Sequence, residues 1–189
     1  KYYIFGGEES YGYSIGDYVR DKDAVITSML LAEMVCYLKS QNLNAIELLD
    51  HIYKEYGYFD HNLINLKFKD SISFTKGKER LEKFRKTPPA KINNYKVTKI
   101  LDLEKDKLYD IDKKELPASN TIQIYLSENI KITVRPSGTE PKTKIYVQIS
   151  EDIAKRKTKI LNSFELNDVK KEITTQSEEI SKLIQNYFI

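Results

Sequence analysis

The chain has 189 residues, of which 40% are hydrophobic and 31% charged, and its formal net charge is +3. This apolar content is enough for one large domain or two small ones and excludes a chain that is disordered throughout. The nearly balanced charge does not indicate a nucleic-acid partner, and no apolar run is long enough to cross a membrane. Cys36 is the single cysteine, which fits a reducing compartment. We therefore expect a cytoplasmic protein without nucleic-acid or membrane partners.

The first polar stretch follows a short buried strand that we predict over residues 2–5. It runs from Gly6 to Gly12 and contains Glu8, Glu9 and Ser10. Carboxylates accept two hydrogen bonds and a serine hydroxyl both donates and accepts, so this loop suits sugar hydroxyls best, with a metal as a second use. An acidic surface turn is the ordinary alternative.

A helix is predicted over residues 24–38, because Asp21 or Asp23 can cap its first turn. It is apolar on most sides, and we expect it to be largely buried. Lys22 then lies between two carboxylates at the start of the helix, where it could exchange protons or hold a phosphate. A solvated lysine in a capping segment is the alternative.

A second helix is predicted after Asn44, which forms a capping-box pattern with Glu47, and Gly57 is a plausible end. From Tyr58 the pattern alternates as in a strand or hairpin that reaches Phe74, followed by a short helix over residues 77–86. We place a domain boundary in this stretch, giving domains 1–60 and 61–189. Further strands are expected around Tyr95, over 122–126, before Arg135 and after Lys142, and a last helix over 166–187. Such a domain is α+β, with helices on one face of an antiparallel sheet. His51 and His61, the two histidines, lack the spacing of metal ligands.

The loop Val134 to Lys142 joins two of these predicted strands and reads VRPSGTEPK. Arg135 carries a planar permanent charge that matches phosphate oxygens, and Ser137 and Thr139 offer hydroxyls. Gly138 allows a close approach to the backbone or a positive φ, and Lys142 adds a charge after the turn. The composition fits an anion site, while a plain hairpin connection is the alternative.

Three motifs together resemble the α-D-phosphohexomutases, the phosphoglucomutase and phosphomannomutase superfamily. They are Gly7 to Ser10, Arg20 to Asp23 and Arg135 to Pro141, in that order. The sequence around these motifs is most similar to bacterial phosphoglucomutases of the branch that includes phosphopentomutase-like members. The resemblance implies the tail of an α/β third domain followed by a TATA-binding-protein-like α+β fourth domain.

The resemblance also implies roles for single residues. Glu8, Ser10 and Arg20 would contact the substrate. Lys22 would be the proton-shuttling or phosphate-holding lysine. The residues of the last motif would bind the non-reacting phosphate: Arg135, Ser137, Gly138 and Thr139, with Lys142 beside them. The family transfers phosphate through a phosphoserine and a bisphosphorylated sugar, with Mg²⁺ and an activator of the glucose 1,6-bisphosphate type.

The chain departs from the family pattern in one respect. It contains no serine-centred phosphoserine loop and no aspartate-rich metal loop. We therefore expect the substrate-recognition half of a mutase that interconverts hexose 1-phosphate and hexose 6-phosphate. The missing N-terminal mutase domains and a phosphorylated sugar would be its partners, the Mg²⁺ ligands would lie outside this chain, and the fragment alone would be inactive. A stand-alone module that binds phosphorylated ligands without catalysis is the alternative.

Overall fold

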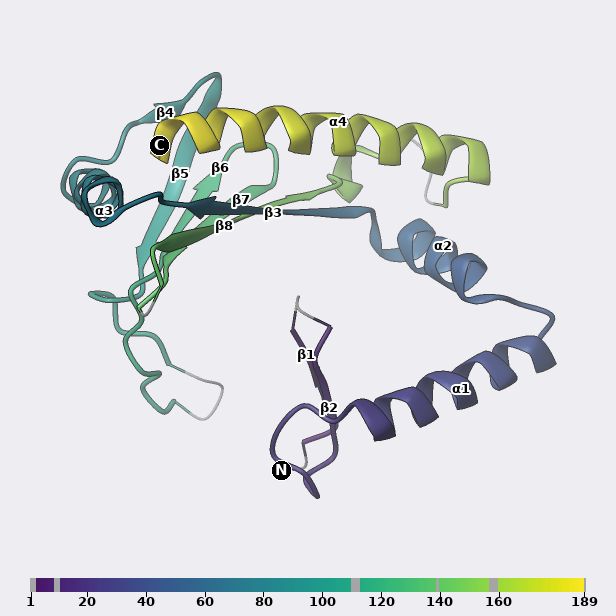
Figure 1. Ribbon diagram of the computed structural model, residues 1–189. Coiled ribbons are helices and arrows are strands. Elements are labelled where there is room, and N and C mark those ends of the chain that lie inside the picture. Colours follow the sequence, from purple (N-terminus) through teal and green to yellow (C-terminus); the bar gives the residue numbers. More distant parts are fainter. Residues whose placement is uncertain (1–2, 9–10, 110–112, 139, 157–159, 189) are drawn as a thin grey trace. The chain divides into compact units, whose positions relative to one another are not determined.

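The computed structural model describes residues 3–8, 11–109, 113–138, 140–156 and 160–188 (Figure 1). The chain divides into two compact units, Lys1–Ile52 and Tyr53–Ile189. None of the described helices is long and apolar enough to cross a membrane.

The first unit contains a hairpin, one helix and most of a second helix, whose last residues, 53–56, belong to the second unit. Strand β1 (Phe5–Gly7) pairs antiparallel with β2 (Tyr13–Ile15), and α1 (Ala24–Ser40) and α2 (Ala45–Tyr56) follow. The Asp23 carboxylate caps α1 by accepting from the backbone N–H groups of Val25 and Ile26. Asn44 and Glu47 form the expected capping box at the start of α2. Gly57 ends α2 with a φ of 94°, which favours glycine.

Two predictions for this unit were wrong. Of the predicted strand over residues 2–5, residue 2 lies outside the described residues and only Phe5 is in a strand, which spans Phe5–Gly7; the Phe5 side chain is exposed. In α1 only Leu38 is buried, although the helix is apolar on most sides. The reason is the same in both cases. A two-stranded hairpin and two helices do not offer enough surface to cover every apolar side of α1 or a second face of the strands.

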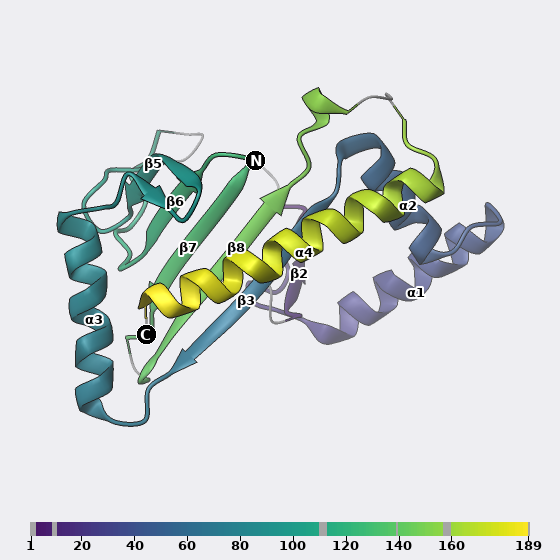
Figure 2. The same ribbon diagram turned by 90° about the horizontal axis from the view of Figure 1, so that it is seen from above.

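The second unit is built on a six-stranded antiparallel sheet in the order β3-β8-β7-β6-β5-β4 (Figure 2). The strands span Phe59–Lys67 (β3), Lys91–Ile92 (β4), Tyr95–Asp102 (β5), Ile122–Leu126 (β6), Ile130–Pro136 (β7) and Lys142–Ser150 (β8). The helices are α3 (Ser71–Lys86), the short 3-10 helix η1 (Ile153–Lys155) and α4 (Ser163–Phe188). Figures 1 and 2 show α4 running across one face of the sheet.

The core lies between that face and the two long helices. Alternate residues of β6, β7 and β8 are buried, as in the 0% exposed Ile124, Ile132 and Val147, and pack with Phe84 of α3 and Ile184 of α4. The three-residue turn that joins β6 to β7, Ser127 to Asn129, has positive φ at both Glu128 and Asn129. The predicted α+β class with helices on one face is confirmed.

The boundary between β3 and α3 differs from the sequence prediction. We expected a strand or hairpin to reach Phe74 and a helix from residue 77, but the strand ends at Lys67 and the helix begins at Ser71. Asp70 caps the helix: its carboxylate accepts from the Ser73 N–H at 2.7 Å, and the Ser73 hydroxyl lies 3.3 Å from the Asp70 N–H. This capping box overrides the alternating pattern that continues through Ile72 and Phe74.

Candidate functional site

The loop between β7 and β8 is held at both ends by the sheet. In the antiparallel register Arg135 lies opposite Lys144 and Pro136 opposite Thr143. The Ser137 N–H donates to the Lys142 carbonyl at 2.9 Å, and the Phe68 N–H donates to the Pro141 carbonyl at 2.9 Å. The sheet therefore fixes the two ends of the loop.

A small pocket lies at this loop. It encloses about 240 Å³ and is lined by Arg135, Pro136, Ser137, Gly138, Lys142 and Lys144. A Cβ atom built on Gly138 would meet no atom within 4 Å, so the backbone there faces open space. Gly138 is not among the described glycines with positive φ, which are Gly16 and Gly57. A glycine at this position therefore serves to let a ligand approach the backbone closely. The opening suits a small anionic group better than a large apolar ligand.

The side chains around the pocket are strongly basic, but one of them, Lys142, forms an ion pair. The Lys142 ammonium lies 2.5 Å from the Glu140 carboxylate. The hydrogen bond from Lys142, its charge and the charges of Lys144 and Lys67 lower the pKa of Glu140 below its usual value. A phosphate that enters the pocket would compete with Glu140 for Lys142, while Arg135 lies exposed at the rim.

Lys144 was missed in the sequence analysis. It lies two residues beyond Lys142 in β8, so both side chains are on the same face of the strand. The sequence contained enough information to find it. Side chains alternate between the two faces of a strand, and an antiparallel hairpin around the loop places Lys144 near Arg135.

The other predicted motifs lie in the first unit, around the tip of its hairpin. The Glu8 N–H donates to the Gly12 carbonyl at 2.9 Å, which closes the loop. A Cβ atom built on Gly12 would lie 2.4 Å from the Glu8 carboxylate and 2.7 Å from the Lys22 side chain. Glu8 and Lys22 therefore meet over Gly12, and a side chain at that position would push them apart.

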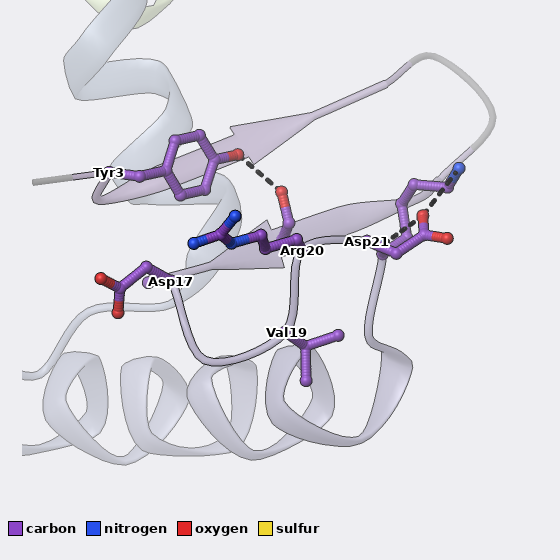
Figure 3. Close-up of a pocket in the computed structure, with 8 residues that line it drawn as sticks. Tyr3, Asp17, Val19, Arg20 and Asp21 are labelled. Carbon is purple, nitrogen blue, oxygen red and sulfur yellow. Dashed lines mark hydrogen bonds and ion pairs between the residues drawn. The ribbon is translucent and has the colours of Figure 1, made fainter.

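A second pocket lies beside Lys22 in the first unit (Figure 3). It encloses about 480 Å³ and is lined by Tyr3, Ser14, Gly16, Asp17, Val19, Arg20, Asp21 and Lys22. The Tyr3 and Ser14 hydroxyls lie 2.6 Å apart. Figure 3 shows the Arg20 side chain extending toward the same space as Tyr3 and Asp17. The pocket thus combines two cations, two carboxylates and a pair of hydroxyls, a set that can bind a polar ligand.

Lys22 is held as a cation. Its ammonium lies 3.1 Å from the Asp21 carboxylate. The hydrogen bond and charge of Asp21, together with the charge of Glu8, raise the pKa of Lys22 above its usual value. At neutral pH the side chain is therefore protonated and can bind an anion, while its raised pKa makes it a poorer proton donor.

The predicted residues fall into two groups, one in each unit. Glu8, Arg20 and Lys22 lie together in the first unit, and Arg135, Ser137, Gly138 and Lys142 in the second. Glu9, Ser10 and Thr139 lie outside the described residues. Within the part of the chain that the structure describes, no group of three or more His, Cys, Asp or Glu side chains could hold a metal ion.

Comparison with known proteins connects both units to one class of enzymes. The family model described as phosphoglucomutase/phosphomannomutase, alpha/beta/alpha domain III, matches residues 1–56. A phosphoglucomutase of Staphylococcus epidermidis is 37% identical over 159 residues, which cover 79% of this chain and 28% of that protein. One from Staphylococcus aureus strain MRSA252 is 34% identical over 166 residues, covering 81% of this chain and 29% of that protein.

A solved structure agrees with the fold. The open form of pp63/parafusin, a phosphoglucomutase from Paramecium, superposes with a TM-score of 0.54 at 17% identity, over 94% of this chain and 30% of that one. The chain belongs to the phosphohexomutase superfamily, the phosphoglucomutases and phosphomannomutases, and matches the C-terminal part of these enzymes. It spans less than a third of the length of the relatives reported above.

Proposed function

We propose that the whole protein is a phosphosugar mutase that interconverts hexose 1-phosphate and hexose 6-phosphate, and that this chain supplies much of its substrate recognition. The observation that carries the proposal is the pocket at Arg135, where a guanidinium, two lysines, a serine and an open glycine surround a small space. Charge-assisted hydrogen bonds from such a set are the strong ones, and arginine binds phosphate through two parallel bonds. In this proposal the pocket holds the phosphate that does not react.

The first unit would read the sugar. Glu8 and Ser10 would accept and donate hydrogen bonds to hydroxyl groups, and Arg20 would contact the substrate beside them. We favour the phosphate-holding role of Lys22 over the proton-shuttling one, because a raised pKa keeps its ammonium charged at neutral pH and makes it a weaker proton donor. Residues 1–60 would then correspond to the end of the third mutase domain and residues 61–189 to the fourth, with Arg135, Ser137, Gly138, Thr139 and Lys142 as the phosphate-binding set.

The proposal places the chemistry outside this chain. The phosphoserine, the Mg²⁺ ligands and a bisphosphorylated activator would act with the remaining mutase domains, and this chain alone is expected not to convert glucose 1-phosphate to glucose 6-phosphate. Measurable conversion by the purified 189-residue chain would contradict that expectation.

Replacing Arg135 with Ala tests the phosphate role directly. Loss of hydrogen bonds from a charged group to phosphate costs about 1.5–3 kcal/mol, so the KM of the full-length mutase for glucose 1-phosphate should rise by about 10- to 100-fold. Arg80→Ala is a matched control, because Arg80 is an exposed arginine on α3 in the same unit. An Arg135→Ala enzyme with unchanged KM and kcat would refute the role.

A stand-alone binding module is the second candidate. It is favoured by the position of the pocket, whose lining residues all lie between 135 and 144 on one hairpin. The amide signals of Gly138 and its neighbours should shift when glucose 1-phosphate is added to the 189-residue chain. A mutase requires in addition that the full-length protein has turnover, which a module would lack.

A further inference from the structure

The sheet of the second unit has two faces of very different composition. One packs against α3 and α4, and the other, which we call the helix-free face, carries the alternate residues of β3, β5, β6, β7 and β8 (Figure 1). The strand register places these basic residues on it: Lys67, Lys99, Lys131, Arg135, Lys142 and Lys144. Among the strand positions of this face, all of which the structure describes, none is Asp or Glu.

Near the pocket, basic residues lie directly opposite each other. Arg135 of β7 is opposite Lys144 of β8, and Lys142 of β8 is opposite Lys67 of β3. Like charges in such cross-strand positions destabilise a sheet. Glu140, in the adjoining loop, offsets part of this charge through its ion pair with Lys142. The arrangement favours an anion at this end of the face.

The positive charge continues beyond the pocket to a second cluster. Tyr125 lies opposite Lys131 on one side and Lys99 on the other. The Lys131 ammonium is 5.7 Å from the centre of the Tyr125 ring, and the Lys99 ammonium is 5.6 Å from it. Both ammonium groups therefore gather over the same ring on the helix-free face, where the ring's negative face attracts them.

The row between the two clusters is uncharged. Thr133 lies opposite Gln123 on one side and Tyr146 on the other. Lys131 precedes Arg135 by four residues in β7, which corresponds to about 13 Å along a strand. Lys99 lies two strands away in the row of Lys131, about 16 Å from Arg135 by the same strand geometry. Both lysines are too distant to contact a phosphate in the pocket, but they are close enough to attract it electrostatically.

We propose that Lys99 and Lys131 are steering residues, which attract phosphorylated ligands to the helix-free face and strengthen their binding in the Arg135 pocket through long-range charge interactions. This inference rests on the proposed phosphate role of that pocket. Clustered charges of one sign raise the local concentration of an oppositely charged ligand, and salt screens the effect. The Debye length is about 30 Å at 10 mM salt and shorter than about 8 Å above 0.15 M.

The expected size of the effect follows from these distances. A phosphate dianion attracted by two charges at about 13 and 16 Å in water should bind about three-fold more tightly at 10 mM ionic strength because of them. At 0.5 M the same two charges should change the dissociation constant by less than about 1.3-fold. Dependence on salt therefore separates steering from direct contact.

The test uses the 189-residue chain and the double variant Lys99→Gln/Lys131→Gln. Glucose 1-phosphate is titrated at pH 7.5 while the amide signal of Gly138 is followed, at 10 mM and at 0.5 M ionic strength. The variant should bind about three-fold more weakly than wild type at low salt and equally at high salt. Lys171→Gln/Lys182→Gln is the matched control, since it removes the same charge from exposed positions on α4 and should leave binding unchanged.

Each other result overturns the proposal in a distinguishable way. Equal affinity of the double variant and wild type at 10 mM would remove the steering role and leave the phosphate pocket intact. An equal loss at both salt concentrations would indicate a structural effect of the substitutions. The phosphate role of the pocket fails if glucose 1-phosphate does not shift the Gly138 signal of wild type, or if the shift persists in Arg135→Ala. In either case the steering role fails as well.

Discussion

Replacing Arg156 with Met is expected to destabilise the second unit by about 3 kcal/mol. Arg156 and Glu151 form a buried ion pair, with side chains that are 3% and 10% exposed. The guanidinium donates to both carboxylate oxygens, at 2.9 and 2.6 Å, and to the Lys54 carbonyl in the last turn of α2 at 2.5 Å. One side chain thus joins the last residues of α2, which belong to the second unit, to the segment that follows β8.

The magnitude follows from what the substitution leaves behind. Removing one partner of a buried pair costs about 3–5 kcal/mol, because the other charge stays buried without compensation. We expect the lower end, since Glu151 still accepts a hydrogen bond from the Tyr58 N–H at 3.0 Å. With a urea m-value of about 2 kcal/mol/M, the unfolding midpoint should fall by about 1.5 M.

Urea unfolding followed by far-UV circular dichroism measures this shift. Lys155→Gln is the matched control, because the Lys155–Asp152 pair beside it is largely exposed, at 76% and 34%, and should contribute less than about 0.5 kcal/mol. In a Glu151→Gln background, Arg156→Met should cost clearly less than in wild type, since no charge is left unpaired. The reasoning is refuted if Arg156→Met lowers the midpoint no more than Lys155→Gln does.

The remaining predictions concern a carboxylate, a glycine and a serine. Burial raises the pKa of Glu151, but the hydrogen bonds from Arg156 and Tyr58 and the Arg156 charge together bring it below its usual value of 4.5. The stability that this group contributes is therefore present at neutral pH and lost as pH falls through the lowered pKa. Wild type and Glu151→Gln should therefore differ in free energy of unfolding at pH 7 and converge once the pH is below the lowered pKa; a constant difference would contradict this. Gly138→Ala should leave the free energy of unfolding within about 0.5 kcal/mol, because its Cβ meets no atom, yet weaken glucose 1-phosphate binding by filling the opening; unchanged binding in an amide titration would count against the pocket. Ser177 is 0% exposed and its hydroxyl has no hydrogen-bond partner in the described structure. Ser177→Ala should therefore raise the free energy of unfolding by about 0.5–1 kcal/mol, and a loss of stability would contradict this.

Local signals in the sequence predicted local structure well where a side chain caps a helix. Asn44 and Glu47 predicted the start of α2, and the capping box is present. The same kind of signal at Asp70 and Ser73 was overlooked, because the apolar residues after it continue the alternation of β3. The sequence contained both the alternation of a strand and the capping box of a helix. The hydrogen bonds of the capping box are present in the structure, and this segment is a helix.

Burial was predicted less well than secondary structure. The apolar pattern of α1 indicated a buried helix, but a pattern states only that a helix can be buried. Whether it is buried depends on neighbouring elements, and the first unit offers too few of them. In the second unit the alternation of β6, β7 and β8 did predict the core, because α3 and α4 cover one face of the sheet.

The candidate site divides in the same way. The sequence by itself indicated the kind of chemistry, since arginine, serine, glycine and lysine around one turn suit a phosphate in any fold. Its motifs also pointed to the family. Only the tertiary structure decided which other charges surround that turn. Lys144 lies opposite Arg135, Lys67 opposite Lys142, and Lys131 and Lys99 flank Tyr125 because strands distant in the sequence pair in a defined register. Register follows from the burial of one whole face of the sheet, a property that no single segment carries.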